Sequence, residues 1–341
     1  MYILGAGCSL NYTESTHGIR GLRSPRNDDF FRMARLVIEN SGMKFDDLFM
    51  EEIGILVKTI ASLYGSKSDI GLFDNPNLRL EEVMTLLDID FRLFSSLAAQ
   101  RLGQNESRQM RSLKDLLART LDYALMGPPC RKHHSLAKMM KRGDLVLSLN
   151  YDILIDNALY GLGKIADSGY MMNFFRVNQD GEWARPSPNQ SEIALFKLHG
   201  SLNWVRCGLC GVLLLYRHKK QALNGVQFFR CPRCSSDETG ERMMIPPIQS
   251  KDYRDKDIAF LWIQADRMMK DLSRIVCIGY SFSPLDFDMS SLMRRLRARQ
   301  TSVPEVDFVS PDKRAEERLK LLLGVKKTNQ FDDLSHYLEL T

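Results

Sequence analysis

The sequence of 341 residues contains no apolar run of about 18 residues, the length that a membrane-spanning helix requires. Its first residues also lack a basic segment followed by an apolar stretch and a cleavage site, the pattern of a secretory signal. There is no internal repeat and no low-complexity segment. Hydrophobic residues at 44% and charged residues at 26% are ordinary for a globular protein. We therefore expect a cytoplasmic protein that does not interact with a membrane.

Cysteine is scarce, and four of the seven cysteines form two Cys-x-x-Cys pairs: Cys207, Cys210, Cys231 and Cys234. The twenty residues between the pairs match the spacing of a tetrahedral Zn²⁺ site. Four thiolates fill such a site and leave no open position, so we predict a structural zinc rather than a catalytic one. Apolar stretches at 212–216 and 226–229 predict two short strands of a small zinc ribbon.

The other three cysteines are Cys8, Cys130 and Cys277. An odd number outside the pairs fits a reducing compartment better than a disulfide framework. Two disulfides, or four unrelated thiols, are the alternative interpretation of the paired cysteines.

The net charge of +5 and three short basic clusters raise the question of nucleic-acid binding. The clusters lie at 138–142, 217–220 and 294–299. Each is short, and the last falls on a predicted helix whose apolar positions would face inward. Solvated helix faces are the favoured interpretation, and direct nucleic-acid contact is the minority one.

The spacing of apolar residues predicts helices through most of the segment 27–142, at 30–39, 46–64, 80–100 and 108–126. The rest of the chain alternates between compact strand signals and helix patterns. The strand signals lie at 2–4, 145–149, 195–198, 275–278 and 306–309, and the helix patterns at 152–162, 258–272, 286–299 and 312–323. This alternation predicts an α/β fold with a doubly wound, parallel, Rossmann-like sheet.

Three parts follow from these patterns. We predict a Rossmann-like domain made of residues 1–26, 143–203 and 241–341, a helical module inserted at 27–142, and the zinc ribbon at 204–240.

Polar motifs come directly after several predicted strands, where ligands of such sheets bind. The glycines of Gly5-Ala6-Gly7-Cys8-Ser9 permit close backbone approach to a pyrophosphate. The motif lacks the third glycine and the acidic ribose partner of the dinucleotide fingerprint, and tight packing of strand against turn is the alternative.

Two further strands end in groups suited to acid-base or electrostatic catalysis. Asn150 and Asp152 share a turn in which the amide can orient a water or a ribose hydroxyl and the carboxylate can support positive charge. An Asx turn that begins the next helix is the alternative. His199 is placed for acid-base work near neutral pH, or is a satisfied core residue.

The fourth motif, 279–284, begins Gly279-Tyr280-Ser281 and follows the strand at 275–278. Its small residues and hydroxyls are suited to contact ribose or adenine. A simple turn from strand to loop is the alternative.

The order of these motifs, with the four-cysteine ribbon between the third and the fourth, resembles the sirtuin family of NAD-consuming enzymes. The resemblance extends from Leu4 to about Pro284 and includes residues 18–24, where Arg23 takes the place of the family's arginine. It implies that Asn150, Asp152 and His199 are catalytic, with His199 as the general base. The NAD-binding residues that it implies are Gly5, Ala6, Gly7, Cys8, Ser9, Arg23, Asn150, Tyr151, Asp152, Gly279, Tyr280 and Ser281.

The sequence departs from the protein deacetylases of that family. Eight residues separate Ser9 from Gly18, Gly21 stands where deacetylases carry an aspartate, and residues 245–252 lack their Phe-Gly-Glu. The long helical module is similar to that of sirtuin-like proteins of bacterial antiphage defence, which hydrolyse NAD.

The resemblance therefore implies an NAD⁺ glycohydrolase that acts in antiphage defence by depleting NAD. It implies a homo-oligomer, and a partner ATPase or nucleic-acid-sensing protein. The alternatives are an NAD-dependent protein deacylase and a non-catalytic module that binds NAD or ADP-ribose and regulates a partner.

Overall fold

The structure is a computed structural model that describes residues 1–10, 12–40, 47–94, 106–177, 183–184, 191–216, 230–236, 240–248, 255–283 and 286–341. The chain divides into two compact units. The first, the sheet unit, comprises Met1–Glu14, Gly127–Met244 and Asp252–Thr341, and the second, the helical unit, comprises Ser15–Met126 and Ile245–Lys251. The finer three-part division expected from the sequence stays a prediction.

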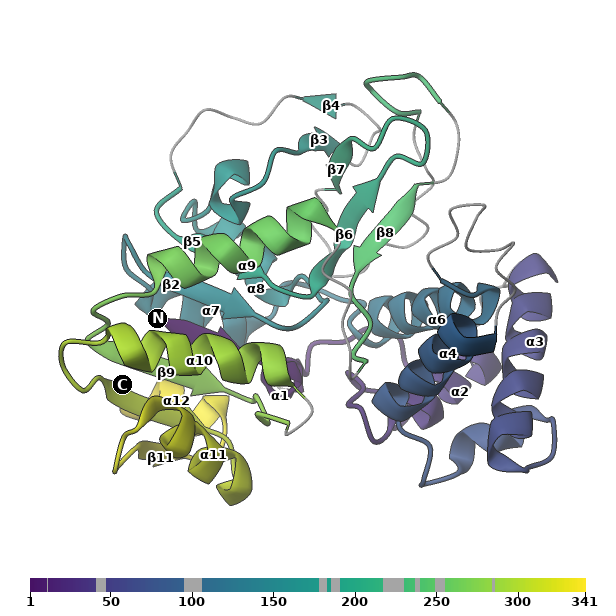
Figure 1. Ribbon diagram of the computed structural model, residues 1–341, viewed down its shortest axis with the longest axis horizontal. Coiled ribbons are helices and arrows are strands. Elements are labelled where there is room, and N and C mark those ends of the chain that lie inside the picture. Colours follow the sequence, from purple (N-terminus) through teal and green to yellow (C-terminus); the bar gives the residue numbers. More distant parts are fainter. Residues whose placement is uncertain are drawn as a thin grey trace. The chain divides into compact units, whose positions relative to one another are not determined.

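A six-stranded parallel sheet forms the centre of the sheet unit (Figure 1). Its strands are β1 (Tyr2–Leu4), β2 (Leu145–Ser148), β5 (Ala194–Lys197), β9 (Arg274–Ile278), β10 (Glu305–Val309) and β11 (Asn329–Phe331). They are arranged in the order β11-β10-β9-β1-β2-β5, and every neighbouring pair is parallel. Strands β2 and β5 thus follow on one side of β1, and strands β9, β10 and β11 follow on its other side. This is the strand order of a Rossmann fold, with its reversal between β1 and β9.

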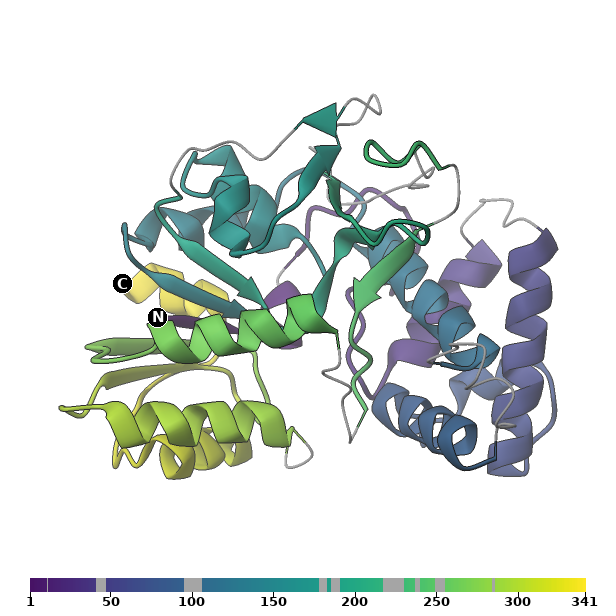
Figure 2. The same cartoon turned by 45° about the horizontal axis from the view of Figure 1, so that its top comes forward.

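Two groups of helices cover the faces of this sheet (Figures 1 and 2). In the first group α7 (Arg131–Met139) packs against α8 (Leu154–Gly161) and α12 (Leu334–Leu340). In the second, α10 (Phe287–Arg299) packs against α9 (Lys256–Met268) and α11 (Lys313–Leu323). Aspartate side chains cap α9, α11 and α12, each by accepting bonds from amides of the first turn. The predicted doubly wound α/β class is confirmed.

A second sheet of the same unit has the order β4-β3-β7-β6-β8. Its strands are β3 (Phe175–Val177), β4 (Trp183–Ala184), β6 (Gly200–Arg206), β7 (Leu213–Tyr216) and β8 (Glu241–Met244). One face buries an apolar cluster that includes Val205, Leu214 and two of the paired cysteines. The predicted strand at 212–216 corresponds to β7, whereas the one predicted at 226–229 lies outside the described residues.

The helical unit contains the helices that the apolar spacing predicts: α2 (Phe30–Asn40), α3 (Asp47–Tyr64), α4 (Leu80–Phe94) and α6 (Arg108–Ala124), with a short 3₁₀ turn at Ile70–Asp74. In α3 one apolar stripe is turned inward, and its buried side chains include Phe49, Ile53 and Ile60. In α6 burial is more extensive and includes every residue from Thr120 to Ala124. The predicted continuation of α4 to residue 100 lies outside the described residues. Within the described segments, the chain contains no helix with the length and apolarity to span a membrane.

Candidate functional site

The glycine turn after β1 packs tightly against the turn after β9. Gly5 N donates to Ile278 O at 3.0 Å, and Gly7 N donates to Gly279 O at 2.9 Å. A Cβ atom on Gly7 would lie 2.7 Å from Gly279 Cα, and one on Gly279 would lie 2.3 Å from Cys8 N. This mutual contact therefore excludes a side chain at Gly7 and at Gly279, which is the packing interpretation of the motif. Binding of a pyrophosphate by the turn stays a prediction.

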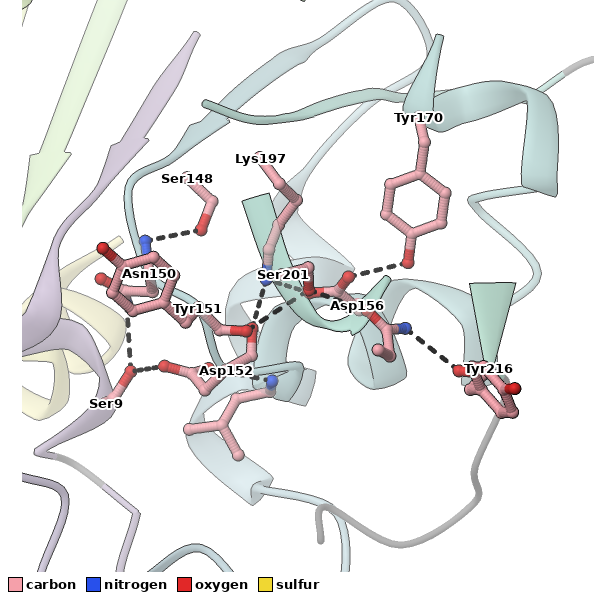
Figure 3. Close-up of polar contacts among 12 residues, drawn as sticks. Ser9, Ser148, Asn150, Tyr151, Asp152, Asp156, Tyr170, Lys197, Ser201 and Tyr216 are labelled. Carbon is pink, nitrogen blue, oxygen red and sulfur yellow. Dashed lines mark hydrogen bonds and ion pairs between the residues drawn. The ribbon is translucent and has the colours of Figure 1, made fainter. Parts of the chain in front are cut away.

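Ser9, Asn150 and Asp152 form a hydrogen-bonded group at the carboxyl ends of β1 and β2, here called the strand-end cluster (Figure 3). Ser9 Oγ donates to Asp152 Oδ2 at 2.5 Å. Asn150 Nδ2 donates to Gly5 O at 2.9 Å and to Ser9 Oγ at 3.0 Å. Because these bonds use both hydrogens of the amide, a ligand that approaches Asn150 would meet its side-chain oxygen. Asn150 is half-buried, whereas Ser9 and Asp152 are buried.

Asp152 also bonds to the first residue of α8, the helix that follows it. Its other carboxylate oxygen, Oδ1, accepts a hydrogen bond from the amide of Leu154 at 3.1 Å, which is the geometry of an Asx turn. The alternative interpretation of this turn is thus confirmed for one oxygen, while the second oxygen belongs to the strand-end cluster. A carboxylate held on both oxygens has a fixed position and acts on its surroundings through its charge.

Next to this cluster, the buried imidazole of His133 lies between two thiols, those of Cys8 and Cys130. Cys8 Sγ lies 3.3 Å from His133 Nε2, and His133 Nδ1 lies 3.1 Å from Cys130 Sγ. Burial lowers the pKa of His133 to about 4, against the opposing effect of the Asp152 charge. Burial also raises the pKa of Cys8 well above its ordinary value and that of Cys130 to about 11. At neutral pH all three groups are uncharged.

Cys8 was predicted to bind the ligand, whereas no role was predicted for His133. No part of Cys8 is exposed in the structure, and its side chain faces the interior. The members of the predicted set in the sheet unit that remain at least partly exposed are Ala6, Gly7, Asn150, Tyr151, Gly279 and Ser281.

His199 lies two residues after the end of β5 and is 7% exposed. Its ring centroid is 6.5 Å from that of Tyr151 and 6.3 Å from that of Trp262. The indole of Trp262 is held in turn by a 3.0 Å bond from its Nε1 to Leu198 O. The structure thus places His199 beside the turn that carries Asn150 and Asp152, with two aromatic rings around the imidazole.

Lys197, two residues before His199, is fully buried, and its ammonium contacts the main-chain oxygen of Asp152 (Figure 3). It also forms an ion pair of 3.1 Å with Asp156. No role was predicted for Lys197 or Asp156. A lysine inside the apolar run Leu195-Phe196-Lys197-Leu198 was the available signal, because lysine is almost never fully buried without a partner.

Three other residues of the predicted site, Tyr280, Ser281 and Arg23, form their described bonds with residues outside the strand-end cluster. The hydroxyl of Tyr280 donates to the carboxylate of Asp286, and Ser281 is exposed while its main-chain oxygen accepts from Arg318 at 2.9 Å. Pro284, at the end of this motif, lies outside the described residues. Arg23 belongs to the helical unit, where it forms an ion pair with Asp29.

The paired cysteines converge. The sulfurs of Cys207 and Cys234 are 3.7 Å apart, those of Cys210 and Cys231 are 3.6 Å apart, and all four lie within 4.8 Å of one another. A tetrahedral zinc with Zn–S bonds of about 2.3 Å separates its sulfurs by about 3.8 Å. The four thiols therefore fit a structural zinc, as predicted, and leave no position for a substrate.

Several solved structures are similar to this chain, and two of them are described here. No protein-family model matches the chain, and no curated protein matches its sequence. A structure of Sir2 in complex with the inhibitor EX-527, 2′-O-acetyl-ADP-ribose and a deacetylated p53 peptide is 13% identical, with a TM-score of 0.35 over 75% of this chain and 83% of that one. A mutant Sir2 homologue in complex with ADP-ribose is 14% identical, with a TM-score of 0.41 over 87% and 94%. At TM-scores below 0.5 this likeness assigns no ligand to the chain.

Proposed function

We propose that this protein is an NAD⁺ glycohydrolase, which cleaves NAD⁺ into nicotinamide and ADP-ribose. The observation that carries the proposal is the strand-end cluster. It gathers a carboxylate, an amide and a hydroxyl at the carboxyl ends of β1 and β2, next to the strand-order reversal where ligands of Rossmann-like sheets bind. His199 lies beside the same turn, so a base, a carboxylate and an orienting amide are neighbours.

The reaction breaks the bond between C1′ of the ribose and the nicotinamide nitrogen. The bonding electrons leave with the cationic nicotinamide ring, which becomes neutral, and positive charge develops on the ribose. The fixed carboxylate of Asp152 stabilises that charge through space. Water oriented by the side-chain oxygen of Asn150 then attacks C1′. His199 takes the proton of this water, either directly or through a ribose hydroxyl.

Incubation of the purified protein with NAD⁺ and separation of the products tests the proposal. The wild type should release nicotinamide and ADP-ribose in equal amounts. We expect Asn150→Ala and His199→Ala each to lower the rate about 100-fold or more, the effect of losing an orienting dipole or a general base. His134→Ala, which alters a histidine of α7, is the matched control and should keep the rate.

The same assay separates the alternatives. A deacylase would release nicotinamide only with an acyl-lysine peptide and would form an acylated ADP-ribose. A non-catalytic module would bind ADP-ribose and release nothing, and His199→Ala would leave its biological activity intact. Either result would replace the hydrolase proposal.

We further propose that NAD⁺ hydrolysis by a homo-oligomer of this chain protects a bacterial cell against phage, with a partner ATPase or nucleic-acid-sensing protein. The support for this role is the sequence resemblance to defence proteins and the large helical unit. Cells that express the wild type should lose NAD⁺ after infection and form fewer plaques, whereas cells with Asn150→Ala should do neither. Equal plaque numbers on both strains across a phage panel would remove the proposal.

A further inference from the structure

Lys197 occupies an unusual place for a charged side chain. It is the last residue of β5, it pairs in register with Ser148 of β2, and its side chain is completely buried. Its neighbours Phe196 and Leu198 are also fully buried. Burying an ammonium group requires compensation by partners, because the charge loses its hydration.

Two partners compensate the charge. The ammonium contacts the main-chain oxygen of Asp152 and lies 3.1 Å from Asp156 Oδ2. Asp156 is itself fully buried, and its other oxygen accepts a 2.7 Å hydrogen bond from Tyr170. Tyr170 is fixed by edge-on contact with the ring of Trp204, at 5.6 Å between centroids. Figure 3 shows Asp156 between the polar ends of the Lys197 and Tyr170 side chains, beside the turn at 150–152.

Stability alone is a weak explanation for this network. A buried ion pair loses roughly as much in desolvation as it gains in attraction, so apolar residues of similar volume stabilise a core as well or better. The network does, however, fix one specific atom, the carbonyl oxygen of Asp152. The preceding carbonyl, that of Tyr151, accepts from Leu202 N at 2.9 Å and from Ser201 Oγ at 3.3 Å.

The carbonyl oxygens of Tyr151 and Asp152 are therefore both held by residues of one short segment, 197–202. The same segment contains His199. We propose that Lys197 is a positioning residue, which holds the turn of Asn150 and Asp152 in register with His199 for reaction with the ribose of NAD⁺. This inference rests on the proposed function. Lys197 touches no reacting atom; it acts through the main chain of the turn.

The test variant is the double substitution Lys197→Met with Asp156→Asn. It removes both buried charges together, so neither is left unpaired, and it keeps side chains of similar size. Lys164→Met is the matched control. Lys164 also binds main-chain oxygens with its ammonium, those of Ala137 and Lys138 at 2.9 and 3.0 Å, but these lie at the end of α7.

We expect the double variant to fold, with a thermal midpoint close to that of the wild type, and to lose at least tenfold in kcat while its KM for NAD⁺ changes less than threefold. Lys164→Met should retain the wild-type kcat. A folded double variant with wild-type kcat, or an equal loss of kcat in both variants, would overturn the proposal.

Hydrogen exchange separates this result from a failure of the proposed function. The amides of Leu154 and Leu202, which bond the turn, should exchange faster in the double variant than in Lys164→Met. If the wild type releases no nicotinamide, the hydrolase proposal fails, and exchange then decides alone: unchanged protection of both amides would overturn the positioning role.

Discussion

Ser9 Oγ donates a 2.5 Å hydrogen bond to Asp152 Oδ2 and so joins the turn after β1 to the turn after β2, across 143 positions of sequence. Both side chains are buried, so water cannot replace either partner. The bond fixes the carboxylate at the place where the proposed reaction develops positive charge.

Ser9→Ala should therefore impair folding and turnover together. Asp152 would keep its bond from Leu154 but lose the hydroxyl, which costs about 1–3 kcal/mol for a buried acceptor. Urea unfolding and the NAD⁺ assay measure the two effects. Ser135→Ala, an exposed serine on α7, is the control and should change neither; a Ser9→Ala protein as stable and active as the wild type would contradict the prediction.

The contact between the turns after β1 and β9 predicts an effect of Gly279→Ala. Gly279 has a φ of +62°, and a Cβ there would lie 2.3 Å from Cys8 N. Gly163 has a similar φ of +68° but no atom within 4 Å of the added Cβ. Both alanine variants share the cost of a positive φ, about 1 kcal/mol. Gly279→Ala should lose clearly more free energy of unfolding than Gly163→Ala, and equal losses would show that the contact is unimportant.

His133 predicts a pH dependence of stability. Its pKa is lowered by burial to about 4 from an ordinary value of 6.5, so between these values the unfolded chain binds a proton that the folded chain does not. The free energy of unfolding should therefore fall as the pH drops from 6.5 towards 4, by up to about 3 kcal/mol.

Urea titrations of the wild type and of His133→Phe at pH 7 and pH 5 test this prediction. The variant lacks the imidazole that titrates in this range. The loss of stability between the two pH values should be smaller in this variant by about 2 kcal/mol. His134→Phe changes the adjacent residue of α7 and should keep the full wild-type dependence. If the free energy of unfolding depends on pH in the same way in all three proteins, His133 is not the group responsible.

The four-cysteine cluster predicts one bound zinc per chain. Cys234→Ser should lose the metal and loosen the second sheet, because Cys207 and Cys231 also belong to its apolar cluster. Metal analysis of the purified protein and limited proteolysis measure both effects. Cys277→Ala lies in β9 outside the cluster and should retain the zinc. A zinc content unaffected by Cys234→Ser would contradict the prediction.

The sequence predicts five of the six strands of the parallel sheet, because they are short apolar runs, and the longer helices, because their apolar residues recur at helical spacing. Of the described strands of the second sheet, only β7 was predicted. β11 escaped prediction because Asn329, Gln330 and Phe331 contain one apolar residue among two polar ones. The seven-residue α12 was also not predicted, being too short for a clear periodic signal.

Sequence also locates residues at strand ends but not their partners. Asn150 and Asp152 could be proposed because parallel strands end at one edge of the sheet. The contact of Cys8 with His133, by contrast, joins residues 125 positions apart and depends on how α7 packs. The same holds for Lys197 and Asp156, whose pairing follows from the position of α8 beside β5.

Strand β6 begins one residue after His199 and ends one residue before Cys207. One strand thus runs from the proposed general base to the zinc ligands. A chelating agent that releases the metal would free the far end of this strand and lower turnover, although zinc takes no part in the chemistry. A metal requirement found in an activity assay would therefore reflect the anchoring of a strand and would not identify a metal-catalysed reaction.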